Sequence, residues 1–345
     1  MSNPPVHRWQ VEIETRRGDY VESRSRVSAV ALDPRGKALL VAGEPSLPVF
    51  WRSAAKFIQA LSLFTSGALT RFGFTDAELA LACASHSGGD EHVAIVRQML
   101  EKIGATEADL HCGPHSPLGE AQARALASRG PVLGRPTKLH NNCSGKHAGM
   151  LASCRAHGFP IADYNRLHHP LQQEILAHFA QVTALPREQI QTAVDGCGAV
   201  VFRSPLDALA RAYVRLCTDE LPAPHRDSGR RIRAAVAAAP ELIAGPLRLC
   251  TDLSRVTGGR VFGKIGAEGV YGLGVESGPH GPAGLAVKIE DGNGKLLGPL
   301  LCALLARLGW LRSEELLGLA AHASLPIRNH QDERVGEIRV QIGEL

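Results

Sequence analysis

Hydrophobic and polar residues follow different periods in different parts of the chain. Near the N-terminus, aliphatic runs over residues 26–32 and 38–42 flank the turn sequence Asp33-Pro-Arg-Gly-Lys37, a pattern typical of a β-hairpin. The middle of the chain instead carries apolar residues at helical spacing, and Thr75 with Glu78 forms a capping-box signal. Helices are therefore predicted over residues 53–63, 75–83, 91–103, 168–182, 188–190, 206–217 and 227–239.

Beyond Val256 the pattern changes to short apolar runs separated by glycine-rich turns. It predicts strands over 263–266, 270–274, 285–290 and 337–342, a hairpin turn over 291–294 and an apolar helix over 297–308. Strands then occupy both ends of the chain and helices the middle. If the terminal strands share one sheet, the chain forms a single α+β domain over 1–345. Its sheet lobe would span about 1–52 and 256–345, its mainly helical lobe about 53–255, with a cleft between them.

Composition narrows the class of protein. Charged residues make up 21% and hydrophobic residues 44%, which is ordinary for a globular protein, and the net charge of +4 is spread without a basic block, which argues against nucleic-acid binding. No apolar run approaches ~20 residues, so no membrane-spanning helix is expected. Residues 1–7 lack the pattern of an export signal, and the eight cysteines include no Cys-x-x-Cys pair. These features predict a reduced, cytoplasmic protein.

Lysine is scarce in this chain. Lys and Arg total 38, and only eight of them are Lys. Because Arg supplies most positive charges, a retained Lys can mark a position where the amine must lose its proton, which Arg does not do. Lys56, Lys146 and Lys264 stand out because each lies in a polar, serine- or glycine-containing motif. The alternative for any one of them is a surface lysine left by drift.

Three short motifs could carry chemistry. In Ser53-Ala-Ala-Lys56, residues i and i+3 share a helix face, so a neutral Lys56 amine could accept the proton of the Ser53 hydroxyl. The loop Ala84-Ser-His-Ser-Gly-Gly89 is small and hydroxylic, which lets a ligand approach closely, and Gly263-Lys-Ile-Gly266 would supply an amine and N–H donors from a strand. Taken singly, these motifs also fit a chance pair, a helix C-cap turn and a surface lysine beside a bulge.

The stretch His140-Asn-Asn-Cys-Ser-Gly-Lys-His147 is the most polar in the chain. It packs a thiol, two imidazoles, an amine, two amides and a hydroxyl into one turn, and an apolar run follows at once. A core segment has no use for so many polar groups, because each would need a buried partner. The stretch therefore indicates a polar turn that presents side chains into a site.

Cysteines in and beyond this turn are candidates for a metal site. Cys143, Lys146 and Cys197 would give zinc two thiolates and an unusual amine ligand, with Asp195 orienting a ligand or a water molecule. Spacing alone does not bring residues 143 and 197 together. The segment His111-Cys-Gly-Pro-His115 is the competing metal candidate by spacing.

Taken together, these motifs resemble the thermolabile L-asparaginase II family of rhizobial type. The resemblance covers most of the chain, and the motifs occur in the order of the family. They are Ser53-Ala-Ala-Lys56, Ala84-Ser-His-Ser-Gly88, Cys112-Gly-Pro-His115, His140-Asn-Asn-Cys-Ser-Gly-Lys-His147, Asp195-Gly-Cys-Gly198 and Gly263-Lys-Ile-Gly266.

The resemblance implies an α+β fold like that of serine β-lactamases, penicillin-binding proteins and glutaminases, with an antiparallel sheet formed from both chain ends and a helical lobe. It implies an amidohydrolase that converts L-asparagine to L-aspartate and ammonia, and a homodimeric assembly; from the composition, neither nucleic acid nor a membrane is expected as a partner. Two Ser–Lys pairs would act in catalysis, Ser53 with Lys56 and Ser85 with Lys264, and Ser53 is expected to attack the side-chain amide. Three further residues would line or support the substrate pocket: His86, Ser87 and Asp195. The implied zinc ligands are Cys143, Lys146 and Cys197.

Other functions fit parts of the same pattern. A glutaminase or a β-lactam-type serine acylase could use the same scaffold, and comparing ammonia release from asparagine and glutamine with hydrolysis of a β-lactam would separate them. A zinc-stabilised amino-acid-binding protein without turnover would bind ligand but release no ammonia. The Ser-x-x-Lys motif together with Lys264 argues against that second class.

Overall fold

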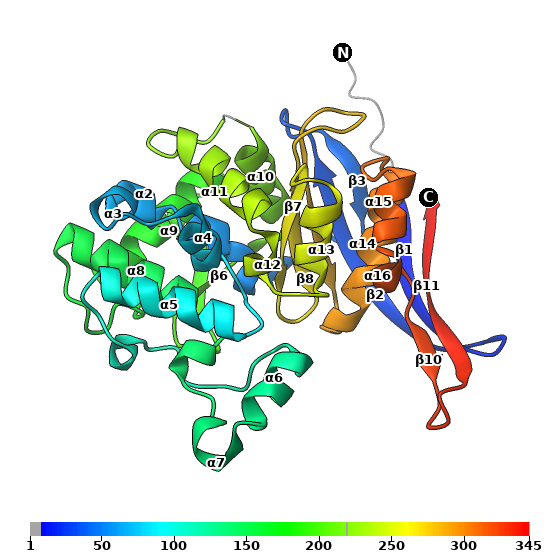
Figure 1. Ribbon diagram of the computed structural model, residues 1–345. Coiled ribbons are helices and arrows are strands. Elements are labelled where there is room, and N and C mark those ends of the chain that lie inside the picture. The colour runs from blue at the N-terminus through cyan, green and yellow to red at the C-terminus, as the bar shows by residue number, and fades with distance from the viewer. Residues whose placement is uncertain (1–7, 219, 345) are drawn as a thin grey trace. The chain divides into compact units, whose positions relative to one another are not determined.

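The computed structural model describes residues 8–218 and 220–344, so residues 1–7, on which the expected lack of an export signal rests, lie outside the described residues. The chain forms two compact units. The sheet unit contains the described residues up to Ala54, the segment Arg203–Thr218 and those from Val256 onward; the helical unit contains Ala55–Phe202 and the described part of Asp219–Arg255. The α+β architecture is thus confirmed, with strands near both chain ends and helices in the middle (Figure 1).

An eight-stranded sheet forms the frame of the sheet unit. Its strand order is β10-β11-β1-β3-β2-β9-β8-β7, and β1 also pairs with β2. The strands are β1 (Arg8–Arg17), β2 (Tyr20–Leu32), β3 (Ala38–Ala42), β7 (Val261–Gly266), β8 (Val270–Val275), β9 (Ala283–Ile289), β10 (Pro326–Arg328) and β11 (Arg334–Glu344). Strands from the two ends of the chain pair directly, as Ile13 opposite Val340 shows. The pairing is antiparallel except for a short parallel contact between β1 and β3, so the sheet is mixed.

Helices cover both faces of this sheet. Helix α10 (Leu206–Cys217) packs on β2, β8 and β9, and α14 (Leu297–Arg307) lies on the other side with α15 (Ser313–Gly318) and α16 (Ala320–Ala323) (Figure 1). Gly284 in β9 makes the first contact possible, because a Cβ there would come within 2.3 Å of the Ala210 carbonyl oxygen. The sequence interpretation had placed residues 206–217 in the helical lobe; their apolar stripe instead covers the sheet.

The helical unit is built around α8 (Ser144–His157), whose first eleven residues are all buried. Helices α4 and α5 pack against it, together with α2, α3 and α9. The helices of this unit are α1 (Lys56–Gln59), α2 (Ser62–Thr65), α3 (Ala68–Arg71), α4 (Asp76–Ala82), α5 (Asp90–Lys102), α6 (Glu120–Ala127), α7 (Gly130–Leu133), α8, α9 (Pro170–Thr183), α11 (Arg226–Ala238), α12 (Pro240–Ile243) and most of α13 (Leu249–Val256). Gly145 lets α8 approach α4, since a Cβ there would lie 2.4 Å from the Leu81 carbonyl oxygen.

Shorter elements complete the chain. They are the strands β4 (Pro48–Phe50), β5 (Gln191–Val194) and β6 (Val200–Pro205), and the 3-10 helices η1 (Arg52–Ala55), η2 (Glu107–Asp109), η3 (Lys138–His140), η4 (Arg187–Gln189) and η5 (Gly294–Leu296). Strand β4 pairs with the end of β6. Over the described ranges, no helix has the length and apolar character needed to cross a bilayer.

Two local predictions differ from the structure. The single helix expected over 53–63 is divided into η1, α1 and α2, and the Ser62 hydroxyl donates to the Gln59 carbonyl oxygen at 3.0 Å, where α1 ends. The expected hairpin over 291–294 leads into a helix instead, because the Asn293 side chain accepts the Lys295 N–H at 3.2 Å and caps η5. Strand β1 was not predicted, although its apolar positions alternate with polar and charged ones as in a half-buried strand.

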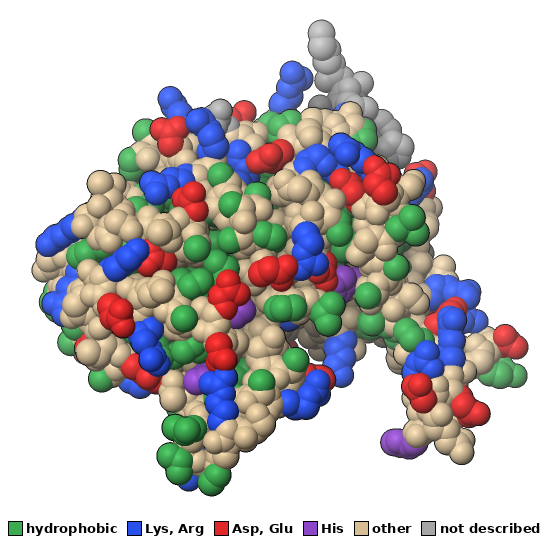
Figure 2. Space-filling model, in the orientation of Figure 1, with side chains coloured by type: hydrophobic (Ala, Val, Ile, Leu, Met, Phe, Trp, Pro, Cys, Tyr) green, Lys and Arg blue, Asp and Glu red, His purple; other side chains and the backbone are tan. Residues whose placement is uncertain are grey.

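The surface carries mixed charge. On the face shown in Figure 2, basic and acidic side chains are interspersed, and apolar side chains gather at the tip formed by α7. Val132 and Leu133 in α7 are 78% and 75% exposed. The dispersed charge agrees with the composition.

Candidate active site

Lys56 begins α1 and places a buried amine among three polar atoms. Its Nζ lies 3.0 Å from Ser85 Oγ and 3.4 Å from the Asn142 carbonyl oxygen, and it also donates to the Ala84 carbonyl oxygen. The two carbonyls can only accept hydrogen bonds, whereas the Ser85 hydroxyl can accept from the amine or donate to it. The site therefore accommodates both the ammonium and the neutral amine, and the contact with Ser85 is a route for a proton.

Ser85 belongs to a loop that α12 holds in place. Its backbone N–H donates to the Ile243 carbonyl oxygen at 3.0 Å, and Ser87 Oγ donates to the Ala244 carbonyl oxygen at 2.7 Å. Gly88 has a φ of 76°, and a Cβ there would lie 2.9 Å from the His140 carbonyl oxygen. The loop thus passes close to the polar turn 140–147, and only glycine fits at that point.

His86 is fully buried in the same loop. The Gly88 N–H donates to His86 Nδ1 at 3.1 Å, so the ring proton lies on Nε2 and is donated to Ser144 Oγ at 2.9 Å. The Ser144 hydroxyl in turn donates to the Leu139 carbonyl oxygen at 2.9 Å. Burial lowers the pKa of His86 well below its usual value, and the charges of neighbouring groups lower it further. His86 is therefore a neutral group that joins the Ser85 loop to the polar turn.

Cys143, Lys146 and Cys197, the three residues that the resemblance implies as zinc ligands, lie close together in the helical unit. Cys143 is the N-cap residue of α8, and Lys146 lies in its first turn. Lys146 Nζ is 3.1 Å from Cys197 Sγ, and the Cys143 thiol hydrogen-bonds to the same sulfur. All three side chains are buried.

The charges in this cluster are strongly coupled. The hydrogen bond from Cys143 lowers the pKa of Cys197 to about 4, and Lys146 adds to this effect against the opposing influence of burial. The same hydrogen bond, together with burial, raises the pKa of Cys143 to about 12. Burial disfavours the charged form of Lys146, but Cys197, Cys143 and Asp195 outweigh burial and raise its pKa. These directions favour an ammonium–thiolate pair of Lys146 and Cys197 beside a neutral Cys143 thiol.

Asp195 lies in the tight turn between β5 and β6. Its Oδ1 accepts the Gly196 N–H at 2.8 Å, and its backbone carbonyl accepts the Gly198 N–H at 2.8 Å. The turn is fixed from outside by Asn165, whose Nδ2 donates to the Gly198 carbonyl oxygen at 2.8 Å. Asp195 is half-buried, and its charge acts on Lys146.

The competing metal candidate, residues 111–115, fastens the polar turn. His115 Nε2 accepts the Asn142 N–H at 2.9 Å, and Asn141 Nδ2 donates to the Cys112 and Gly113 carbonyl oxygens at 2.8 and 2.9 Å. His111 Nδ1 lies 3.0 Å from Asn165 Oδ1. Among the residues that the structure describes, no group of three or more His, Cys, Asp or Glu side chains is arranged to hold a metal ion. A metal at Cys143 and Cys197 would thus depend on Lys146.

Ser53 and Lys264 both lie in the sheet unit. Ser53 is half-buried in η1, directly after Arg52, which has a left-handed φ of 49° that side-chain-bearing residues rarely adopt. Lys264 in β7 is fully buried, and its Nζ lies 3.3 Å from the Ile265 carbonyl oxygen. A Cβ at Gly266, on the same strand face as Lys264, would come within 2.5 Å of the Trp51 carbonyl oxygen. The end of β7 therefore packs against the start of η1.

The structure thus adds contacts that motif reasoning did not supply. Ser85 Oγ lies 3.0 Å from Lys56 Nζ, whereas the resemblance paired Ser85 with Lys264. Tyr164 was missed altogether: its hydroxyl lies 2.6 Å from His147 Nδ1 and accepts the His111 N–H at 3.0 Å. A tyrosine isolated in sequence from every motif gives no local signal, and only the fold brings it beside α8.

Comparisons with known proteins concern the family and the fold. The model of the L-asparaginase II family matches residues 13–340. No curated protein matches the chain. Among solved structures, a Bacillus glutaminase is 15% identical with a TM-score of 0.38, and the match covers 83% of this chain and 92% of that one. A Bacillus subtilis glutaminase in covalent complex with 5-oxo-L-norleucine is also 15% identical with a TM-score of 0.38, over 82% of this chain and 86% of that one. These structural similarities are too distant to assign a substrate.

Proposed function

Because the chain belongs to the L-asparaginase II family, we propose that it hydrolyses L-asparagine to L-aspartate and ammonia by Ser–Lys nucleophilic catalysis. The observation that supports this mechanism best is the contact of 3.0 Å between Lys56 Nζ and Ser85 Oγ. It joins a buried amine to a hydroxyl through a hydrogen bond that can run in either direction. Such a pair can take a proton from a nucleophile and return it to a leaving group.

In the proposed reaction, neutral Lys56 takes the proton of the Ser53 hydroxyl, and Ser53 Oγ forms a bond to the side-chain amide carbon of asparagine. The carbon–nitrogen bond then breaks, and the leaving nitrogen receives the proton from Lys56 through Ser85, so that ammonia departs. Water hydrolyses the resulting aspartyl ester and restores Ser53. Lys264, fixed on β7, contributes positive charge or relays protons with Ser85.

The proposal includes zinc held by Cys143, Lys146 and Cys197. The donor set fits this metal, since two buried thiols in hydrogen-bond contact and an amine 3.1 Å from one of them are nitrogen and sulfur ligands. Lys146 must give up its proton, and the Cys143 thiol must ionise. When bound, zinc would supply a Lewis acid or an anchor for an anionic substrate group. Asp195 would then orient one of these ligands.

Covalent trapping tests the mechanism. A diazoketone analogue of asparagine should add to the peptide that contains Ser53, which mass spectrometry of a digest can locate. Ser53→Ala should abolish both labelling and ammonia release, whereas Ser85→Ala should keep the labelling site and lose turnover. Labelling at Ser85 in the unchanged protein, or near-normal turnover by Ser53→Ala, would overturn the assignment of the nucleophile. Parallel assays with glutamine decide whether the activity is that of a glutaminase.

A further inference from the structure

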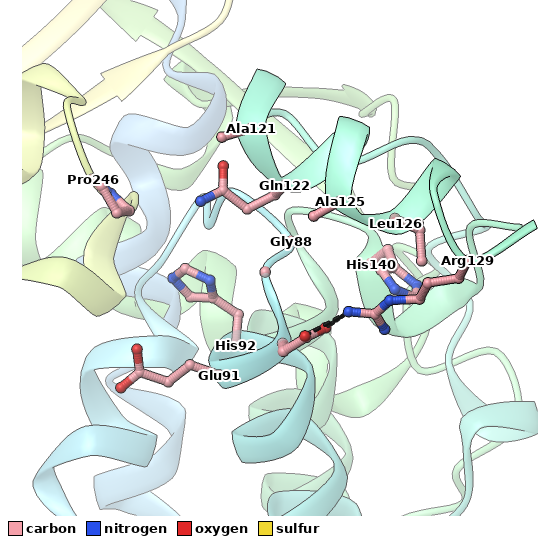
Figure 3. Close-up of a pocket in the computed structure, with 12 residues that line it drawn as sticks. Gly88, Glu91, His92, Ala121, Gln122, Ala125, Leu126, Arg129, His140 and Pro246 are labelled. Atoms are coloured by element: carbon pink, nitrogen blue, oxygen red, sulfur yellow. Dashed lines mark hydrogen bonds and ion pairs between the residues drawn. The ribbon is translucent and has the colours of Figure 1, made fainter. Parts of the chain in front are cut away.

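A cavity of about 340 Å³ opens at the N-terminus of α5, next to the Ser85 loop (Figure 3). It is lined by the start of α5, by α6 and by His140, and none of the residues assigned above to catalysis or zinc lines it. Its volume lies at the lower end of the range of about 300–1,000 Å³ that is usual for small-molecule sites. We call it the α5 cavity.

His140 offers the cavity a hydrogen-bond donor. Its Nδ1 accepts the Thr137 N–H at 3.0 Å, so in the neutral ring the proton lies on Nε2. The residue is only 8% exposed, and within residues 8–218 and 220–344 its Nε2 has no hydrogen-bond partner. Burial lowers the pKa of His140, which keeps the ring neutral. This N–H has no protein partner at the wall of the cavity, so it is available to a ligand that accepts a hydrogen bond there.

His92 lies on the other side of Gly88 and lines the cavity with its ring (Figure 3). Its Nε2 lies 3.3 Å from the Glu241 carbonyl oxygen, which can only accept, so Nε2 carries the proton and Nδ1 is bare. This buried Nδ1 has no partner among the described residues, and burial lowers the pKa of the ring. The bare Nδ1 of His92 is enclosed, so His140 is the histidine that presents a free hydrogen-bonding atom to the cavity.

The charged side chains that line the cavity indicate which kind of ligand it binds. Arg129 Nη2 contacts both oxygens of Asp90 at 2.7 and 2.5 Å, which leaves Glu91 as the unbalanced charge. Gly89, the N-cap residue of the 13-residue α5, gives that helix no side-chain cap, so its first N–H groups also favour a carboxylate. A negative wall with local donors favours a ligand that carries both signs and no net negative charge.

We propose that the α5 cavity binds a neutral, zwitterionic amino acid. Its carboxylate would accept hydrogen bonds from His140 Nε2, Arg129 and the start of α5, and its ammonium group would lie toward Glu91. A ligand bound in the cavity would influence the Ser85 loop, because His92 stacks on His86 with ring centroids 5.0 Å apart. L-Asparagine is itself a neutral, zwitterionic amino acid. If the proposed function holds, a second L-asparagine molecule in the α5 cavity would change the rate at which the first is hydrolysed.

L-Serine is a suitable probe because it is zwitterionic and has no side-chain amide to hydrolyse. Calorimetry should detect L-serine binding to the unchanged protein, and succinate, which lacks the ammonium group, should bind at least tenfold more weakly. Ala125→Phe, which fills the cavity from α6, should weaken L-serine binding at least tenfold. Ala127→Phe is the matched control, because Ala127 is exposed on the same helix and does not line the cavity. Circular dichroism should show that both variants are folded alike.

Three results would overturn the proposal: no L-serine binding to the unchanged protein, equal binding by succinate, or unchanged affinity in Ala125→Phe. Arg129→Gln gives a second test, since it should also lower the affinity for L-serine while Ala127→Phe does not. Ammonia release from L-asparagine is measured separately on the same proteins. L-Serine binding without ammonia release would contradict the proposed function alone, and ammonia release without cavity-dependent binding would contradict this proposal alone.

Discussion

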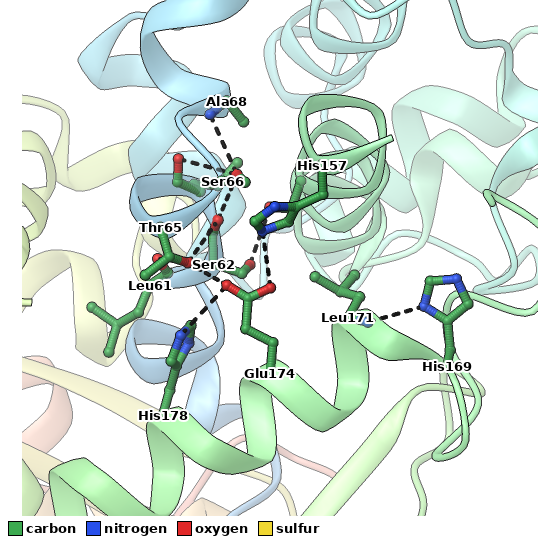
Figure 4. A network of polar contacts seen from close by, with 12 residues as sticks. Leu61, Ser62, Thr65, Ser66, Ala68, His157, His169, Leu171, Glu174 and His178 are labelled. Carbon is green, nitrogen blue, oxygen red and sulfur yellow. Dashed lines mark hydrogen bonds and ion pairs between the residues drawn. The ribbon is translucent and has the colours of Figure 1, made fainter. Parts of the chain in front are cut away.

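Acidification should destabilise the helical unit through His178. This residue lies in a polar network on α9, where its Nε2 is 3.6 Å from Glu174 Oε1 and His157 Nε2 is 3.0 Å from Glu174 Oε2 (Figure 4). The His225 ring packs edge-on against His178 at a centroid distance of 4.5 Å. Burial, with added repulsion from His225 and His157, lowers the pKa of His178 to about 3 despite the nearby carboxylate.

The sign of the effect follows from this lowered pKa. In the unfolded chain the ring takes up a proton near its ordinary value of 6.5, whereas in the folded chain it stays neutral down to about pH 3. The stability linked to His178 is therefore fully present above pH 6.5 and is lost as the pH falls toward 3. At pH 5 the loss is about 2 kcal/mol, since each pKa unit corresponds to about 1.4 kcal/mol.

Urea unfolding of the unchanged protein and of His178→Gln at pH 8 and pH 5 measures this effect. Glutamine is neutral at both pH values, so the variant should lose about 2 kcal/mol less than the unchanged protein between them. The difference in unfolding free energy between the two proteins at pH 8 measures the packing and hydrogen bonding that the substitution removes. A stability difference between the two proteins that is the same at pH 8 and pH 5 would refute the reasoning.

Further predictions concern the amines and the packing of α8. Lys56→Arg should lose ammonia release about as fully as Lys56→Met, because Arg does not become neutral; initial rates of the two variants check this. Cys197→Ser and Lys146→Met should each lower zinc bound per chain at least tenfold, measured by elemental analysis after dialysis, while Cys302→Ser, on α14, should not. Gly145→Ala should destabilise the fold by about 1–3 kcal/mol in thermal or urea unfolding, because its Cβ would meet the Leu81 carbonyl oxygen, and an unchanged midpoint would contradict that close contact.

Periodicity predicted much of the fold because most elements bury one face. Helix α10 and strands β2 and β8 carry long runs of buried apolar residues, and their patterns are readable without the structure. Strand β1 was not predicted, although its buried Val11 and Ile13 alternate with charged side chains in the pattern of a half-buried strand. The break between α1 and α2 was missed because buried apolar residues continue through it, and periodicity does not contain local contacts such as that of the Ser62 hydroxyl with the Gln59 carbonyl oxygen.

The candidate site was predictable where chemistry concentrates in short motifs. Cys143 and Lys146 share one helical turn, so their proximity follows from sequence alone, and the family resemblance supplied Cys197. The hydrogen bond between Lys56 and Ser85 could not be predicted, because it depends on how the loop after α4 is fastened to Ile243. The α5 cavity was missed for the same reason, since its wall joins residues far apart in the chain, such as His92 and His140.

The positions of lysine and arginine in the structure indicate that the buried lysines act by losing and regaining a proton. The buried cationic side chains are Lys56, Lys146 and Lys264, which are 1%, 4% and 0% exposed, and no arginine is among the buried residues of the described chain. Burying any cation is costly, and arginine is the usual choice where a fixed charge must be buried. This chain contains thirty arginines, yet all three buried cations are lysines, the cationic side chain that can lose its proton. The hydrogen-bond partners of Lys56 fit both the ammonium and the neutral amine, so at this position the geometry agrees with what the composition indicates.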